Sequence, residues 1–177
     1  AMIAMAAAIP VVYPHMNAIG GDSFWIVKPA GRAPLGIDAC GAAAANATDD
    51  LYRAAGHDAI PTRGALAANT VAGTLSGWQT ALDIAAQLGG QMSRKRLLEA
   101  AIHHAEQGFP ATGNQARTTT AKLAELKGLP GYDRAFLPGG IPPAEGDLFR
   151  QERLGATLRR LAADGFGSFY DGALAQD

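Results

Sequence analysis

Two short apolar runs joined by a tight turn constrain the fold of this chain more than any other feature. The runs are FWIVK (residues 24–28) and LGID (35–38), and PAGRAP between them supplies turn residues, which predicts a β-hairpin. The preceding GGDSF then forms the turn that leads into the first strand. Because a two-stranded hairpin is only marginally stable in water, we expect it to join a larger sheet. The other strands of that sheet are expected outside these 177 residues.

Most of the remaining chain has helical patterns. The clearest helix spans residues 93–110, where Ser93 is a candidate N-cap and Leu97, Ala101 and His104 fall on one stripe. Further helices are predicted in the second half of 70–90 (Trp78, Leu82 and Ala85 on one face), over 118–128 and over 152–165, with a mixture of helix and turn after Thr48. The alanine-rich first 13 residues are expected to be the end of a buried helix that runs into an extended segment.

No repeat or linker divides the chain, so residues 1–177 are predicted to be one incomplete domain, an α-rich fragment of an α/β protein. Residues 135–151 are predicted to be a turn-rich connector. The apolar N-terminal run is too short to cross a bilayer and contains Pro10, and no basic segment of a signal peptide precedes it. We therefore expect no membrane association, and the sequence leaves the compartment open between cytoplasm and periplasm.

Charge and cysteine content exclude some functions. The net charge is −1, which gives no electrostatic footprint for nucleic acid or for an anionic membrane. The single cysteine, Cys40, excludes an internal disulfide. A nucleophilic cysteine needs a nearby base or cation, and the sequence places none of the four histidines beside it. A lone cysteine is more often a small buried apolar residue, so that interpretation is favoured.

Two other groups have a possible chemical role. The pair Gly20 and Gly21 lacks the Lys-Ser/Thr of a phosphate loop and precedes a strand instead of a helix, which favours a tight turn. Glu99, His103 and Glu106 share one helix face, but the zinc pattern H-E-x-x-H is absent. A solvated helix face is favoured, and we expect no metal site and no cofactor.

Five segments follow one another as in a known family. AIGGDSF (18–24) is similar to the pattern GIGGGGF, and IDACGAAAANAT (37–48) stands where that family has ID-R-E-x-AP. NTVAGTLSGWQTAL (69–82) resembles PGTVAGWEAAL, and LLEAAIHHAEQGFPA (97–111) resembles LL-PAI-AEEGFPV. The stretch from RAFLPGG to FYDG (134–172) resembles RIFLP-G-PP-GD-RQ-LA-TLR-IA--G--FY-G. Over nearly its whole length the chain resembles the large subunit of the γ-glutamyltransferase family, a branch of the N-terminal-nucleophile hydrolases.

This resemblance implies an α+β fold, with the chain forming part of a four-layer αββα sandwich. It also implies a precursor that cleaves itself before a threonine, which becomes the N-terminus of a small partner subunit. The threonine hydroxyl attacks an amide carbonyl, and its own α-amine is the general base. The resemblance implies no metal or organic cofactor. The expected partners are the small subunit and a small amide substrate.

The chain departs from the family pattern in two respects. It ends before the position of the cleavage-site threonine, and Thr118, Thr119 and Thr120 lie in the wrong part of the pattern, so we expect no catalytic residue in this chain. The family arginine that binds the α-carboxylate of a γ-glutamyl group is replaced by Cys40, and the following acid is replaced by Gly41. A thiol cannot form a bidentate clamp on a carboxylate.

Three functional hypotheses follow. The first is an amidohydrolase or acyltransferase for amides other than γ-glutamyl compounds, in which residues Asp38, Cys40 and Gly41 form one wall of the substrate pocket. The second is a true γ-glutamyl transferase acting on glutathione-type substrates, whose carboxylate-binding cation comes from elsewhere, with Arg32 and Arg63 nearest along the chain. The third is a non-catalytic binding protein that retains the fold.

Overall fold

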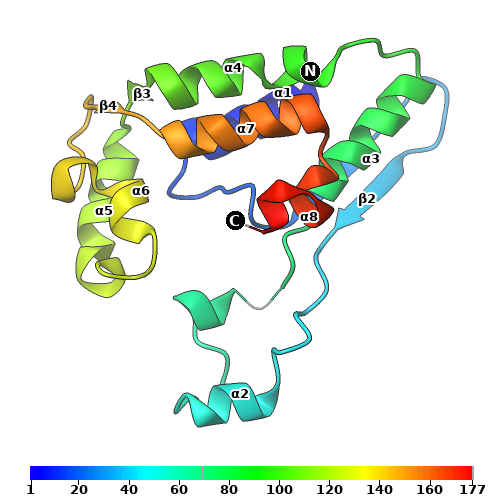
Figure 1. Cartoon of the computed structure of the whole chain (residues 1–177). Helices are drawn as coiled ribbons and strands as arrows, with labels where there is room; N and C mark the ends of the chain where they lie inside the picture. Colours follow the sequence, from blue (N-terminus) through cyan, green and yellow to red (C-terminus); the bar gives the residue numbers. More distant parts are fainter. Residues whose placement is uncertain (69, 177) are drawn as a thin grey trace.

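The computed structural model describes residues 1–68 and 70–176, so Asn69, the first residue of the NTVAG motif, lies outside the described residues. The chain is mostly helical with short strands (Figure 1). The helices are α1 (Met2–Val12), α2 (Asp49–Ala54), α3 (Thr74–Gln87), α4 (Arg94–Gln107), α5 (Gly113–Leu126), α6 (Tyr132–Phe136), α7 (Glu152–Asp164) and α8 (Ser168–Asp171), and the strands are β1 (Ser23–Val27), β2 (Leu35–Ala39), β3 (Phe109–Pro110) and β4 (Leu148–Phe149). Short 3-10 helices lie at Ala65–Ala67, Pro138–Gly140 and Ala173–Ala175.

Helices α1, α4 and α7 lie side by side and form the centre of the core (Figure 1). Ala101 and Ala105 of α4 are fully buried, as are Leu158 and Leu161 of α7. The small side chains on α4 let the helix backbones approach closely, and the leucines fill the remaining space. An edge-to-face contact between Trp78 and Phe166, with ring centroids 5.6 Å apart, joins α3 to the segment after α7.

The predicted hairpin is confirmed. Strands β1 and β2 are antiparallel, and Trp25 lies opposite Ile37. One face, with Trp25 and Ile37, is buried against α3. On the opposite face Phe24 is 71% exposed and Ile26 is 76% exposed. The hairpin therefore has two apolar faces, of which this chain covers one.

The predicted helices are present, with shifts in their limits and faces. Ser93 and Thr48 cap α4 and α2 through their hydroxyl groups, as expected. The buried stripe of α4 includes Leu97 and Ala101, but His104 is only half-buried and Ala105 takes its place. On the expected face of α3, Trp78 is buried and the other two residues are half-buried. The N-terminal helix continues through Pro10, which lies inside it.

The largest difference from prediction concerns residues 109–151. Helix α5 begins at Gly113 instead of residue 118, because the Thr112 hydroxyl accepts a hydrogen bond from the Gln115 N–H and caps it. Within the expected connector, β4 pairs with β3 and the rings of Phe109 and Phe149 meet edge to face. The chain thus has a second, two-residue strand pair in addition to the predicted hairpin.

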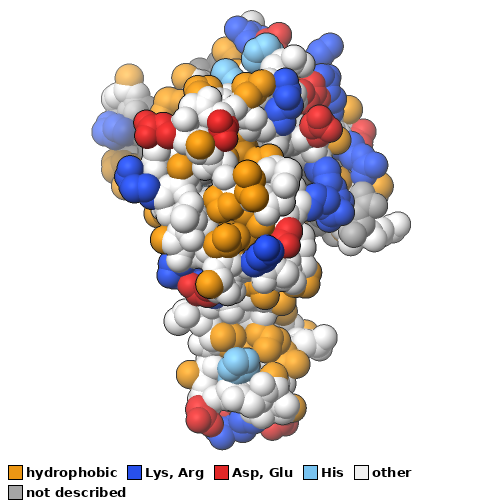
Figure 2. All heavy atoms as spheres, turned by 90° about the vertical axis from the view of Figure 1, so that its left-hand side faces the viewer, with side chains coloured by type: hydrophobic (Ala, Val, Ile, Leu, Met, Phe, Trp, Pro, Cys, Tyr) orange, Lys and Arg blue, Asp and Glu red, His pale blue; other side chains and the backbone are white. Residues whose placement is uncertain are grey.

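Residues 43–68, called the projection below, extend away from the helical core and include α2 (Figure 1). Their base is held by a β-bridge between Ala43 and Thr70 and by a hydrogen bond from the Val71 N–H to the Ala42 carbonyl. Figure 2 shows the projection as a narrow lower lobe, and above it Lys/Arg and Asp/Glu side chains are intermixed on this face. Within the described part of the chain, every helix is too short or too polar to traverse a lipid bilayer.

Candidate functional site

The three predicted wall residues lie together where β2 ends. Asp38 and Ala39 are the last residues of β2, and Cys40 and Gly41 turn the chain away from the hairpin. The backbone N–H of Cys40 donates to Asp38 Oδ1 at 3.1 Å, which closes a tight local turn. We call residues 38–41 the corner.

A second carboxylate, which the sequence analysis did not single out, holds the corner from the other strand. Asp22 Oδ1 accepts a hydrogen bond from the Gly41 N–H at 2.9 Å, and the Cys40 thiol lies 3.6 Å from Asp22 Oδ2. The contact of Asp22 with the corner follows from the register of the hairpin. Because Ser23 pairs with Ala39, the residue before Ser23 must lie beside the residue after Ala39.

Close backbone contacts fix the corner against the start of α3. A methyl group added at Gly41 would overlap the carbonyl of Val71, and one added at Gly73 would overlap the carbonyl of Ala39. The Thr74 N–H and hydroxyl both donate to the Gly21 carbonyl, at 2.9 and 2.7 Å. The GGDSF turn, the corner and the N-terminus of α3 therefore form one rigid unit, whose geometry requires glycine at two positions.

A hydroxyl from the far end of the sequence completes this unit. The Tyr170 hydroxyl of α8 donates to the Ala72 carbonyl at 2.8 Å and accepts from the Ser76 N–H at 3.0 Å. The chain from Ala72 to Ser76 is thus held on one side by the GGDSF turn and on the other by α8.

The expectation that Cys40 is buried is wrong, because its side chain is exposed. The negative charge of Asp22, followed by partial desolvation, the hydrogen bond to Asp22 and the charge of Asp38, raises the pKa of the Cys40 thiol. Cys40 is therefore protonated at neutral pH, which is the opposite of what a nucleophilic cysteine requires.

A pocket of about 290 Å³ adjoins the corner. Its lining comes from α1, from the GGDSF turn and from the start of α3, and includes Met5, Ile9, Asp22, Phe24, Thr74 and Trp78. Asp22 thus contacts the corner and also lines the pocket. The pocket is mainly apolar, and Asp22 is its charged lining residue.

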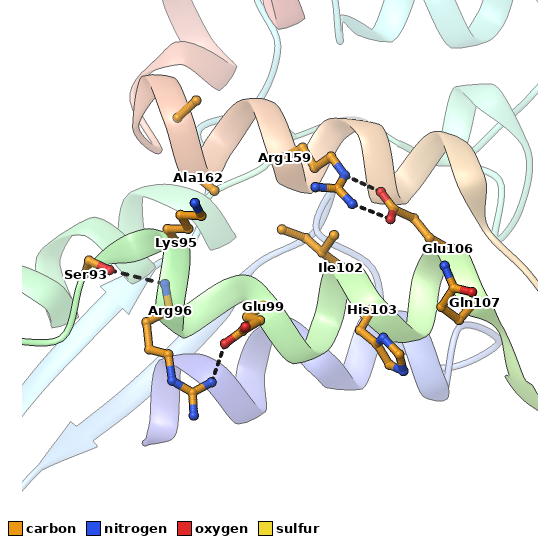
Figure 3. A pocket seen from close by; sticks show the side chains of 11 residues that line it. Ser93, Lys95, Arg96, Glu99, Ile102, His103, Glu106, Gln107, Arg159 and Ala162 are labelled. Carbon is orange, nitrogen blue, oxygen red and sulfur yellow. Dashed lines mark hydrogen bonds and ion pairs between the residues drawn. The ribbon is translucent and has the colours of Figure 1, made fainter.

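A larger pocket, of about 700 Å³, lies between α4 and α7 (Figure 3). The candidate metal group of Glu99, His103 and Glu106 is on its wall, but Glu99 forms an ion pair with Arg96 and Glu106 forms one with Arg159. Over residues 1–68 and 70–176, no three potential metal ligands gather in one place. Both carboxylates of this pocket are therefore paired with arginines, and none of the corner residues lines it.

The remaining candidate residues lie elsewhere. Arg63 is paired with Glu125 of α5. Arg32 is in the hairpin turn, at the opposite end of the strands from Cys40, which is about 13–17 Å along a five-residue strand. The three threonines 118–120 are inside α5, and Thr119 is buried. Neither arginine is at the corner, and no threonine of this group has a free amine.

Comparison with known proteins gives the family. The model of the gamma-glutamyltranspeptidase family matches residues 1–177. The chain belongs to this family. Oxamate amidohydrolase proenzyme from Klebsiella pneumoniae subsp. pneumoniae is 51% identical over 177 residues, which are 99% of this chain and 33% of that protein. Glutathione hydrolase-like YwrD proenzyme from Bacillus subtilis is 36% identical, with the same coverage.

Solved structures of gamma-glutamyltranspeptidase relatives have the same fold over this region. Helicobacter pylori gamma-glutamyltranspeptidase matches with a TM-score of 0.86 and 27% identity, over 99% of this chain and 50% of the other. The cephalosporin acylase of Bacillus halodurans matches with a TM-score of 0.86 and 30% identity, over 98% of this chain and 33% of the other. The expected α+β class is confirmed, and the chain spans about a third of the length of the curated relatives.

Proposed function

We propose that the chain is the large-subunit portion of a self-processing amidohydrolase of the gamma-glutamyltranspeptidase family. The whole protein hydrolyses a small amide whose acyl group is not γ-glutamyl. The observation that carries this proposal is the corner, where an exposed protonated thiol stands between two carboxylates at the position of the family's carboxylate-binding arginine. The 51% identity to an oxamate amidohydrolase proenzyme supports the same class.

The nucleophile is proposed to lie on a partner chain produced from the same precursor. The described residues offer no replacement, because Cys40 is held as a thiol and residues 118–120 are inside a helix. The relatives are about three times as long as this chain, and two of them are named proenzymes. In the proposed reaction, the partner's N-terminal threonine attacks the amide carbonyl. Its amine takes up the hydroxyl proton and returns it to the leaving amine, after which water releases the acyl group.

The chemistry of the corner favours a short acyl group. The α-carboxylate of a γ-glutamyl substrate is three carbons from the reacting carbonyl and needs a cation at the wall. The charges that act on Cys40 are Asp22 and Asp38, both acidic, so a carboxylate at this position is repelled. In oxamate, by contrast, the carboxylate is bonded directly to the amide carbon, so it lies closer to the reacting carbonyl than an α-carboxylate does. A short α-oxo amide therefore suits this corner better than glutathione.

The exposed face of the hairpin is proposed to pack against the rest of the protein. Phe24 and Ile26 form an apolar pair on a strand whose other face is already buried. Packing a second sheet on this face would remove the pair from water and complete a sandwich. It would also bring the partner chain next to Asp38, which lies opposite Phe24 on the same face.

The test uses the intact protein that contains this chain. Denaturing mass spectrometry with N-terminal sequencing is expected to find a second polypeptide that begins with threonine. Turnover of oxamate and other short amides is expected to exceed turnover of a γ-glutamyl anilide by a wide margin. A single polypeptide without turnover would instead favour a binding protein.

A matched substitution separates the two enzymatic hypotheses. Cys40→Arg restores a guanidinium at the corner, and Cys40→Ala removes the thiol without adding charge. We expect Cys40→Arg to lower turnover of short amides and to improve the KM for the γ-glutamyl anilide, while Cys40→Ala does not improve it. Ordinary turnover of the γ-glutamyl anilide by the unchanged protein and by Cys40→Ala would contradict the proposal.

A further inference from the structure

The carboxylate of Asp22 contacts two consecutive residues, Cys40 and Gly41, which directly follow strand β2. Its Oδ1 accepts the Gly41 N–H at 2.9 Å, and its Oδ2 is 3.6 Å from the Cys40 sulfur. Asp22 precedes β1, and the corner follows β2, so the two segments meet only because the hairpin pairs them. The contact is long-range in sequence and joins two parts of the candidate site.

The corner depends on side-chain acceptors because it lies beyond the β-ladder. The last ladder pair is Ser23 with Ala39, so the next two N–H groups have no strand partner. The Cys40 N–H donates to Asp38 and the Gly41 N–H donates to Asp22. Both hydrogen bonds are exposed to solvent, but a charged acceptor forms a stronger bond than a neutral one. Asp22 therefore fixes the path of the chain at the corner.

The surroundings of Asp22 connect this contact to the pocket. Asp22 lines the 290 Å³ pocket together with Phe24 and Thr74. Its neighbour Gly21 receives both hydrogen bonds from Thr74, so the Asp22 backbone is itself held in place. Asp22, Cys40 and Gly41 also replace residues of a different type in the family patterns quoted above, namely a glycine, an arginine and an acid. Three such replacements thus occur in direct contact.

We propose that Asp22 is a positioning residue of the amide site, which holds the Cys40–Gly41 corner in its substrate-facing position. This inference rests on the proposed function and adds to it a residue that controls binding and not the chemical step. The two acidic groups that act on the thiol, Asp22 before β1 and Asp38 on β2, also keep the corner unfavourable for an anionic end of the substrate.

The first test does not depend on activity. In the intact protein, the rate of Cys40 alkylation by iodoacetamide is measured against pH, with mass spectrometry of the peptide that contains Cys40. Asp22→Asn removes the charge and keeps the oxygen, so the thiol pKa falls towards its ordinary value. At pH 8 we expect about 3- to 10-fold faster alkylation than in the unchanged protein, since the thiolate is the reacting form. Asp58→Asn, an exposed acid in the projection, is the control and should change nothing.

The second test measures KM and kcat separately with a short amide. Asp22→Ala leaves the Gly41 N–H without its acceptor, and we expect KM to rise at least about tenfold, as for loss of a hydrogen bond to a charged group. The value of kcat should stay within about twofold. Asp22→Asn should restore most of the KM, because its amide oxygen can accept from Gly41, and it serves in place of Asp22→Ala if that variant does not fold.

The outcomes are distinct. An Asp22→Asn alkylation profile equal to that of the unchanged protein overturns the inference, and so does a loss of kcat at unchanged KM. If the unchanged protein hydrolyses no short amide, the proposed function fails. The alkylation measurement then still decides whether Asp22 controls Cys40.

Discussion

The α4–α7 side of the molecule and the hairpin side differ in how their surfaces are completed. On the first side, leucines and alanines are fully buried between the helices, and the outer groove is lined by charged groups in mutual ion pairs (Figure 3). On the second side, the hairpin buries Trp25 and Ile37 against α3 but leaves Phe24 and Ile26 exposed.

This difference shows on which side the groups of the chain already have contacts within the chain itself. The α4–α7 groove is the larger hollow, but its two carboxylates are paired with arginines and none of the predicted wall residues Asp38, Cys40 and Gly41 lines it. The hairpin side has an apolar face and a corner whose carboxylates meet a thiol and backbone N–H groups. Because exposed apolar faces of this kind are typical of contact surfaces, we propose the hairpin side as the functional side, even though the larger pocket lies on the other side.

The largest expected effect concerns the α4–α7 side. Leu158→Ala in α7 should lower the free energy of unfolding by about 2–5 kcal/mol, because the side chain is fully buried and leaves a cavity. Leu51→Ala, at an exposed position of α2, is the matched control and should cost less than about 1 kcal/mol. Urea unfolding of the intact protein measures both. Equal losses would mean that the projection is buried as deeply as the helical core.

The next effect concerns the corner. Gly41→Ala places a methyl group in the Val71 carbonyl, and a backbone obstacle cannot rotate away, so we expect a loss of about 1–3 kcal/mol. Gly36→Ala on the same hairpin meets nothing within 4 Å and should be nearly neutral. Denaturant midpoints of the two variants give the comparison. If Gly41→Ala left the stability unchanged, the corner would be able to shift away from Val71.

A smaller effect tests the open face of the hairpin. Ile26→Thr keeps β-branching but adds a hydroxyl, and in the intact protein it should cost about 1–2 kcal/mol if the face is covered. Ile141→Thr is the control, because Ile141 is 67% exposed, close to the 76% of Ile26. Thermal unfolding compares them. Equal, near-zero effects would leave the hairpin face in solvent and contradict the proposed sandwich.

The smallest effect concerns the ion pair of the groove. The hydrogen bond from Arg159, followed by its charge, lowers the pKa of Glu106 in spite of partial desolvation. A lowered folded-state pKa stabilises above the ordinary Glu value of about 4.3, and this contribution is lost as the pH falls through the folded-state pKa. Arg159→Ala should therefore reduce stability slightly at pH 7, and the difference should vanish in acid and shrink in high salt. A difference that persists in acid would assign the effect to packing.

The elements with strong local signals could be predicted from the sequence. The hairpin followed from two apolar runs and a Pro/Gly turn, and α4 followed from Ser93 and its apolar spacing. The start of helix α5 was predicted too late, because its cap Thr112 lies six residues before Thr118, where the predicted helix began. The β3–β4 pair could not be predicted, since two-residue strands are stabilised by the contact between Phe109 and Phe149 and not by local pattern.

The residues of the candidate site differ in how far the sequence alone could single them out. Asp38, Cys40 and Gly41 follow one another in the sequence, and their place in a family pattern identified them. Asp22 is 18 residues from Cys40, and only the exact strand register joins them. The exposure of Cys40 was missed because it depends on where the chain turns after β2, which the contact of Gly41 with Val71 decides.

The Tyr170 hydroxyl is synthesised much later than the residues to which it is hydrogen-bonded. It bonds to Ala72 and Ser76, which are 98 and 94 residues earlier in the chain. At roughly 5–20 residues per second, the ribosome makes Tyr170 about 5–20 s after those residues. The segment before α3 therefore leaves the ribosome without one of its two supports. A chaperone or a protease that meets the nascent chain during this interval would encounter residues 72–76 before α8 packs against them.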